Sequence, residues 1–337
     1  MAAFLQKDAC VLFPSGWTAC MAAVKGVARQ GDLILMDAAA HDCLRTGARL
    51  SRATVVKFKS ADPGDLERLL RKHRHKHTNA LIVTEAIFSV DGAVLPEAAF
   101  SEISRRHGCR LLVDVAHALG VWGAGGRGLD DVTRADIIVG TFSKSFVTAG
   151  GFAAAGAALA GLIATTGLVT TANMSNAAAA AALAALRLVR REPARVAGLR
   201  AKIAYARARL ASEVAGLGLR GDGAVIHLPV DMEHDGDSVV AWRLLMAQGV
   251  YCQIMCYPAV APGQAGPRFA ITSAMTTADI DHLVTSVAAM WHALPAVRAA
   301  CDAKAARSGS GGAKGRPLLA RLAGCIGRAA AAAARRR

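Results

Sequence analysis

The chain has 337 residues, of which 53% are hydrophobic, 19% charged and 5% aromatic, so a large core built from Ala, Val and Leu is expected and a disordered protein is excluded. The formal net charge is +15, but ten Lys and Arg residues against one Asp fall within residues 298–337, so the charge does not indicate nucleic-acid binding by the body of the protein. Eight widely spread cysteines favour free thiols in a reducing cytoplasm over a disulfide framework.

Short apolar runs alternate with helical patterns in the first half of the chain. The predicted strands are 33–37, 55–58, 80–85, 110–116 and 137–143, and the predicted helices between them include 65–73 and 100–108. This alternation predicts an α/β fold with a mostly parallel central sheet covered on both faces. Ligands of such sheets bind beyond the carboxyl ends of the strands. The polar residues at these ends are Glu85, Asp114, His117, Thr141 and Lys144.

Residues 145–186 carry no charge, and this length alone could contain a membrane span. Glycines interrupt the stretch, and Thr and Asn residues make its middle polar, so we expect a buried strand, a loop and an Ala-rich helix instead. The first residues show no cationic segment followed by an apolar one, so no signal peptide is expected.

A long helical stretch, bent near Pro193, is predicted to lead into a small α+β domain. Its predicted strands are 224–230, 249–255 and 268–273, and its predicted helices are 237–249 and 277–294. We therefore expect a large domain over 1–190, a small domain over 191–296 and a basic flexible tail over 297–337. A solvated tail is the main interpretation, and weak contact of a basic helix with a membrane surface is the alternative.

No metal site is expected from the sequence. Cys252 and Cys256 are four residues apart, but there is no second pair and no suitably spaced histidine. The run RKHRHKH contains His73, His75 and His77, but it joins a helix to a strand and is expected to be solvated.

Two residues indicate a carbonyl cofactor. A lysine can hold pyridoxal 5'-phosphate (PLP) as a Schiff base, and PLP is an electron sink when a carboxylate keeps its ring nitrogen protonated. Asp114 ends an apolar strand, and Lys144 lies in the turn GTFSKSF after the next predicted strand. Alone, such an Asp is commonly a helix cap and such a Lys is commonly solvated, but together they point to PLP.

The sequence around both residues resembles the α-oxoamine synthase family of fold type I PLP-dependent enzymes. VDVAHALGVWGAGGRGL (113–129) and VGTFSKSFVTAGGF (139–152) carry the resemblance. It extends in the same order to FPSGWTACMAAVKG, GDLILMDAAAHDCLRTG, TEAIFSVDGAVLPE and RFAITSAMTTADID. It covers roughly residues 4 to 292.

The resemblance implies a cytoplasmic homodimer that condenses an amino acid with an acyl-CoA. The product would be an α-aminoketone, released with CoA and CO2. GTFSKSF and YPAVAPGQAGPRF look closer to the serine palmitoyltransferase branch than to the 8-amino-7-oxononanoate synthase branch.

The same resemblance implies roles for individual residues around the cofactor ring. Lys144 would carry the cofactor, and Asp114 would pair with its ring nitrogen. His117 and Ser89 would lie near the phenolic oxygen, and His41 would stack on the ring face. Ordinary alternatives stay open for two of them, because His41 could be a loop histidine and Ser89 a turn residue.

Other residues are implied to bind the phosphate and the substrate. The backbone amides of Gly16 and Trp17 at a helix N-terminus suit an anion, and Thr141 adds a hydroxyl. Thr171 matches a position that reaches the neighbouring subunit's phosphate. Arg268 would grip the amino-acid carboxylate with its planar guanidinium, unless it is a surface arginine.

Several positions depart from the family pattern. Members carry a glycine-rich segment before the motif that here begins at Ser15, which implies a shorter N-terminus. Val115, Cys20, Val147 and Met275 stand where the family has Glu, Asn, Gly and His. Two alternatives to an active synthase therefore stay open. One is a PLP-binding or regulatory subunit, and the other is an aminotransferase or lyase that shares only the cofactor site.

Overall fold

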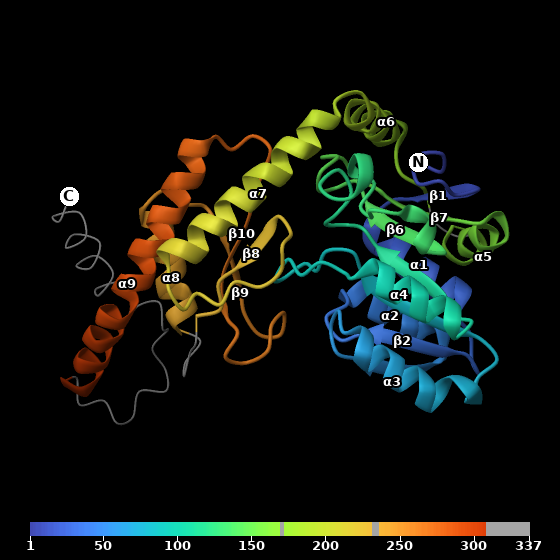
Figure 1. Ribbon diagram of the computed structural model, residues 1–337, viewed down its shortest axis with the longest axis horizontal. Helices are drawn as coiled ribbons and strands as arrows, with labels where there is room; N and C mark the ends of the chain where they lie inside the picture. Colours follow the sequence, from blue (N-terminus) through green and yellow to red (C-terminus); the bar gives the residue numbers. More distant parts are fainter. Residues whose placement is uncertain (169–171, 231–235, 308–337) are drawn as a thin grey trace. The chain divides into compact units, whose positions relative to one another are not determined.

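The computed structural model describes residues 1–168, 172–230 and 236–307 (Figure 1). Thr171 and the segment 308–337 of the basic tail lie outside these residues, so the predictions made for them stay predictions. The chain divides into two compact units. The first consists of Met1–Ser89 and Ala93–Arg200, and the second of Val90–Gly92 and Ala201–Arg337.

A seven-stranded sheet forms the centre of the first unit, in the order β1-β7-β6-β5-β4-β2-β3. Its strands are β1 Ala9–Phe13, β2 Leu33–Asp37, β3 Thr54–Phe58, β4 Ala80–Glu85, β5 Arg110–Asp114, β6 Ile137–Thr141 and β7 Gly151–Ala155. Strands β2 to β6 pair in parallel, whereas β7 is antiparallel to both β6 and β1. The predicted mostly parallel sheet is confirmed, although the sequence analysis did not predict β1.

Helices cover both faces of this sheet (Figure 1). They are α1 Gly16–Val27, α2 Asp42–Ser51, α3 Pro63–His73, α4 Glu97–Arg106, α5 Ala157–Gly167 and α6 Asn176–Arg191, with short 3-10 helices at Arg74–Lys76, Ala124–Gly126 and Val132–Arg134. In β2, Leu33 and Leu35 belong to the core shared with α3, α4 and α6, whereas Ile34 and Met36 belong to the core shared with α1, α2 and α5. Burial on both faces explains why the strands are continuous apolar runs rather than alternating ones.

The described part of the uncharged stretch forms a strand and helices of the first unit. It contains β7, α5 and the beginning of α6, and the sequence analysis predicted the strand and the Ala-rich helix but not α5. Among the described residues, no helix combines the length and hydropathy needed to cross a membrane.

The second unit contains a three-stranded antiparallel sheet in the order β8-β10-β9. Its elements are β8 Val225–His227, β9 Gln253–Met255, β10 Gly266–Ala270, α8 Gly236–Ala247 and α9 Thr277–Arg307, and α7 Pro193–Glu213 leads into it. The expected single bent helix is instead two helices, because α6 ends at Arg191 and Pro193 begins α7. Proline favours a first helical position, where its missing N–H group is not needed.

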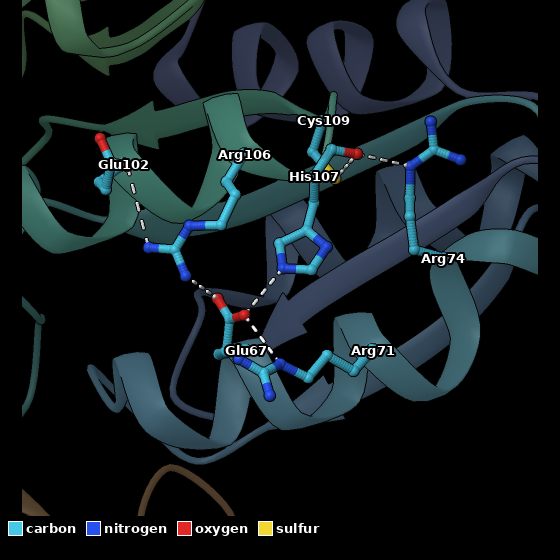
Figure 2. Close-up of polar contacts among 7 residues, drawn as sticks. All are labelled: Glu67, Arg71, Arg74, Glu102, Arg106, His107 and Cys109. Atoms are coloured by element: carbon cyan, nitrogen blue, oxygen red, sulfur yellow. Dashed lines mark hydrogen bonds and ion pairs between the residues drawn. The ribbon is translucent and has the colours of Figure 1, made fainter.

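A polar network joins α3 to the end of α4 on one outer face of the first unit (Figure 2). Glu67 of α3 lies 3.0 Å from the His107 Nε2 atom and accepts from Arg71 at 3.0 Å and from Arg106 at 3.3 Å. Arg74 donates to the His107 carbonyl at 3.0 Å. The His107 contact lowers the pKa of Glu67, and its arginine partners act in the same direction. The Glu67 carboxylate therefore has two arginines and one histidine as hydrogen-bond partners.

Candidate active site at the carboxyl ends of the strands

Two acidic residues lie side by side at the end of the parallel sheet. Glu85 ends β4, Asp114 ends β5, and the two residues are register partners. Both side chains are buried. Thr141, which ends β6, lies at the same edge because β5 and β6 are also parallel neighbours. The structure therefore brings together three of the strand-end residues predicted from the sequence.

Asp114 has few donors for a buried carboxylate. The Ala116 N–H group donates to Oδ1 at 2.8 Å, and the Cys20 thiol donates to Oδ2 at 3.3 Å. Burial raises the pKa of Asp114, and these two donors and the positive charges of Lys144 and His41 oppose that shift. A further cationic partner would stabilise the ionised carboxylate. The protonated ring nitrogen of PLP is such a partner, so the donor set fits this cofactor.

Glu85 lies beside Asp114 and holds the start of α2. Its Oε1 atom accepts the His41 N–H group at 2.6 Å. Burial raises the pKa of Glu85, and the neighbouring Asp114 charge adds to the shift. The sequence left the role of this strand-end glutamate open, and the structure shows that it positions the His41 backbone.

An anion cradle lies where Thr141 meets the N-terminus of α1. A Cβ atom at Gly16 would lie 2.5 Å from the Thr141 Cβ atom, so only glycine allows this approach. Ser15 caps the helix by accepting the Thr18 N–H group at 3.1 Å. The first N–H groups of a helix have no partner within it, and they attract anions. Gly16 and half-exposed Trp17 carry such groups, which fits a phosphate beside the Thr141 hydroxyl.

Lys144 lies in a tight connection between β6 and β7. Buried Phe146 stacks on Phe142, and the Ser145 hydroxyl donates to the Leu119 carbonyl at 2.5 Å, so both residues hold the loop against the core. Lys144 itself is exposed. The loop is thus fixed on either side of the lysine and leaves its side chain accessible.

Val147 imposes a backbone strain three residues after Lys144. Its φ angle is +53°, in the left-handed region that β-branched residues rarely adopt. Its side chain is 84% exposed, so within this chain the cost lies in the backbone rather than in lack of space. The glycine that the family has at this position would relieve it.

Two cysteines lie beneath His41, and the sequence analysis assigned them no role. His41 precedes α2, and its Nδ1 atom lies 3.0 Å from the Cys43 Sγ atom. Cys43 in turn makes a hydrogen bond with Cys20, which is the largest factor that lowers the pKa of Cys43 to about 6. Chain spacing could not reveal this pair, because the two residues lie on different helices, α1 and α2.

The remaining predicted residues fall into two groups. His117 and Ser89 are partly buried in the connections that follow β5 and β4, at the same edge of the sheet as Asp114. Arg268 belongs to the second unit, where it is paired in register with His227 of β8 and Gln253 of β9. Its guanidinium donates to the Gln253 Oε1 atom at 2.9 Å.

The chain is similar to known proteins in both sequence and fold. The family model for aminotransferases of class I and II matches residues 1–287. A putative 8-amino-7-oxononanoate synthase 2 of Mycobacterium tuberculosis H37Rv is 37% identical over 289 residues, which cover 83% of this chain and 37% of that protein. The 8-amino-7-oxononanoate synthase of Symbiobacterium thermophilum is 33% identical over 300 residues, which cover 86% of this chain and 74% of that protein. The chain thus spans little more than a third of the mycobacterial relative.

Solved structures show the same fold. A serine palmitoyltransferase from S. paucimobilis superposes with a TM-score of 0.81 at 23% identity, covering 87% of this chain and 75% of that one. The 8-amino-7-oxononanoate synthase of Francisella tularensis gives a TM-score of 0.71 at 21% identity, covering 85% and 83%. Together, the matched family model, the relatives and the strand-end geometry show that the chain belongs to the α-oxoamine synthase family of PLP-dependent, fold type I enzymes.

Proposed function

We propose that this chain is a PLP-dependent acyltransferase that condenses an amino acid with an acyl-CoA and releases CoA and CO2. One observation carries the proposal. Accessible Lys144 follows β6 in a loop fixed by its neighbours, and buried Asp114 ends the adjacent strand with too few donors for its charge. This is the pairing of amine and carboxylate that a carbonyl cofactor with a basic ring nitrogen requires.

Each end of the cofactor has residues suited to it. Thr141 and the N–H groups of Gly16 and Trp17 would bind the phosphate. Asp114 would hold a proton on the ring nitrogen. When bound, PLP supplies an electron sink for the electron pair left on the amino-acid α carbon.

Three further residues would surround the same ring. His41 would cover its face from the start of α2. His117 and Ser89 would lie near the phenolic oxygen, because both belong to connections that leave the strand-end edge.

Two side chains, the Arg268 guanidinium and the Lys144 amine, would act on the amino-acid substrate. Arg268 would bind the amino-acid carboxylate with its planar fork of donors. Lys144 Nζ would then take the proton from the substrate α carbon as a general base. Orientation by Arg268 would thus decide which α-carbon bond faces the base. Thr171 of a second copy would complete the phosphate site in a homodimer.

A second function has its own supporting observation. The strained Val147 lies in the loop that carries Lys144, so a PLP-binding or regulatory subunit with little turnover is the alternative. The six described cysteines are free thiols, which for either function suits an enzyme of the reducing cytoplasm.

The decisive experiment measures cofactor attachment and thiol release on the same preparation. We expect the purified protein to show the visible absorbance of lysine-bound PLP, and Lys144→Ala to lose it while Lys59→Ala, a matched loop lysine, keeps it. Amino acids and a panel of short, dicarboxylic and long-chain acyl-CoAs are then added, and free thiol is quantified. Thiol release with one donor class supports the synthase. Absorbance without thiol release from any donor supports the subunit, or an aminotransferase or lyase that shares the cofactor site, and no absorbance contradicts them all.

A further inference from the structure

A buried cluster of two thiols and one carboxylate lies at the proposed ring site. The thiols of Cys20 and Cys43 and a carboxylate oxygen of Asp114 all lie within 4.8 Å of one another. The three residues are 2%, 3% and 4% exposed. Burial of the Asp114 carboxylate costs free energy unless a strong partner balances its charge. A ligand that binds both the carboxylate and the neighbouring thiols would provide that balance.

The packing of two helices brings the thiols together. A Cβ atom at Gly47 of α2 would lie 2.7 Å from the Met21 carbonyl of α1, so this glycine lets the two helices approach closely. Cys20 adjoins Met21, and Cys43 lies one helical turn before Gly47. Both thiols therefore converge on Asp114 at the end of β5.

The geometry is near that of a tetrahedral thiolate site. Zinc binds sulfur at about 2.3 Å, so its ligand atoms lie about 3.8 Å apart in a tetrahedron. The Cys20 Sγ to Asp114 Oδ2 distance is already 3.3 Å, and all three ligand atoms lie within 4.8 Å of one another, so small movements would bring them to this spacing. We propose that Cys20, Cys43 and Asp114 form a three-ligand site for a thiophilic divalent transition-metal cation such as Zn²⁺.

The site has a consequence for the cofactor. A metal ion bound to Asp114 would neutralise the charge that keeps the ring nitrogen protonated, so we expect the metal to enter the cofactor-free protein and PLP to compete with it. This competition rests on the proposed role of Asp114, whereas metal binding itself does not. The cation would therefore hold the apoprotein in a form that cannot load PLP.

Cobalt is the probe, because thiolate ligands give Co²⁺ an intense charge-transfer absorbance. PLP-free, full-length protein is kept reduced and titrated with Co²⁺, and Zn²⁺ is then added to displace it. We expect one bound ion per chain with the thiolate signal. Cys20→Ser and Cys43→Ser should each weaken Co²⁺ binding at least tenfold, whereas Cys109→Ser, a half-buried cysteine outside the cluster, should not. Adding PLP should release the ion.

Because a cysteine variant could lose metal binding by misfolding, the site is also tested on the unsubstituted protein by cysteine alkylation. Bound Zn²⁺ should protect Cys20 and Cys43, but not Cys109, from alkylation as mapped by mass spectrometry. Absence of stoichiometric Co²⁺ uptake, or alkylation of the two thiols at the same measurable rate with and without Zn²⁺, would overturn the site. Ion that stays bound when PLP loads would overturn the competition. None of these readouts requires turnover, so they are independent of whether the chain is an active synthase.

Discussion

Two regions of the first unit hold carboxylates whose pKa values are shifted in opposite directions. In the network between α3 and α4, His107 and arginines surround Glu67 and lower its pKa (Figure 2). At the carboxyl ends of β4 and β5, burial dominates and raises the pKa of both Glu85 and Asp114. The charge of Glu67 is balanced by side chains of this chain, whereas the charge at the strand ends requires a bound cationic group to balance it.

This difference separates structure from function on physical grounds. A carboxylate whose partners are all within the chain contributes to stability. A carboxylate held ionised against burial costs stability, and such perturbed groups cluster at functional sites. The strand-end acids are therefore the candidate functional residues, and Glu67 stabilises the contact between α3 and the end of α4.

Removal of the lysine should give the largest effect. We expect Lys144→Ala to lower thiol-releasing activity at least about 10³-fold, because both the covalent attachment and the general base are lost. Steady-state thiol release measures this, with Lys59→Ala as the control. A Lys144→Ala enzyme that keeps a tenth of the activity would remove Lys144 from the catalytic site.

The Asp114→Asn change tests the contrast between the two regions directly. Activity should fall about 10²-fold, because a neutral amide does not keep the ring nitrogen protonated. The cofactor-free variant should nevertheless be as stable as the unaltered chain or up to about 1 kcal/mol more stable, because burial no longer opposes a charge. Urea unfolding and thiol release measure the two quantities. A large loss of stability would make Asp114 structural, like Glu67.

Val147→Gly tests whether strain near Lys144 is stored in the backbone. We expect a gain of about 1 kcal/mol in unfolding free energy, since glycine accepts a φ angle of +53°. Val147→Ala is the matched control and should gain less, because alanine also disfavours positive φ. Equal gains in both variants would place the strain in the side chain instead.

Glu67→Gln should give the smallest effect and leave activity unchanged. We expect a loss of about 1 kcal/mol near neutral pH, because the arginine partners are largely exposed. The sign of the pH dependence follows from the lowered pKa of Glu67. Its contribution is present above the ordinary carboxyl pKa of 4.5 and is lost as pH falls through the lower folded-state value. Unfolding curves of the two proteins should therefore converge in acid, and a constant difference would rule out the ionic contribution.

Much of the strand-end site could be predicted from the sequence. Continuous apolar runs predict strands buried on both faces, and the residue after each run then lies at one edge. That reasoning located Asp114, Thr141 and Lys144. β1, α2 and α5 were not predicted from the sequence. Helix α5 lies in an uncharged, Ala-rich stretch with no polar face to mark its period.

Contacts between distant segments could not be predicted in this way. Cys20 meets Asp114, and Glu67 meets His107, only after helices pack on the sheet. The basic run after α3 illustrates the same limit. It was expected to be solvated, yet Arg74 within it donates to the carbonyls of His77 and His107.

The central claim is that Lys144 carries the cofactor. It is tested by reducing the PLP-loaded protein with borohydride, digesting it and locating the pyridoxyl group by mass spectrometry. We expect one modified peptide, with the group on Lys144 in GTFSKSF. A pyridoxyl group on any other lysine, or on none, would contradict it.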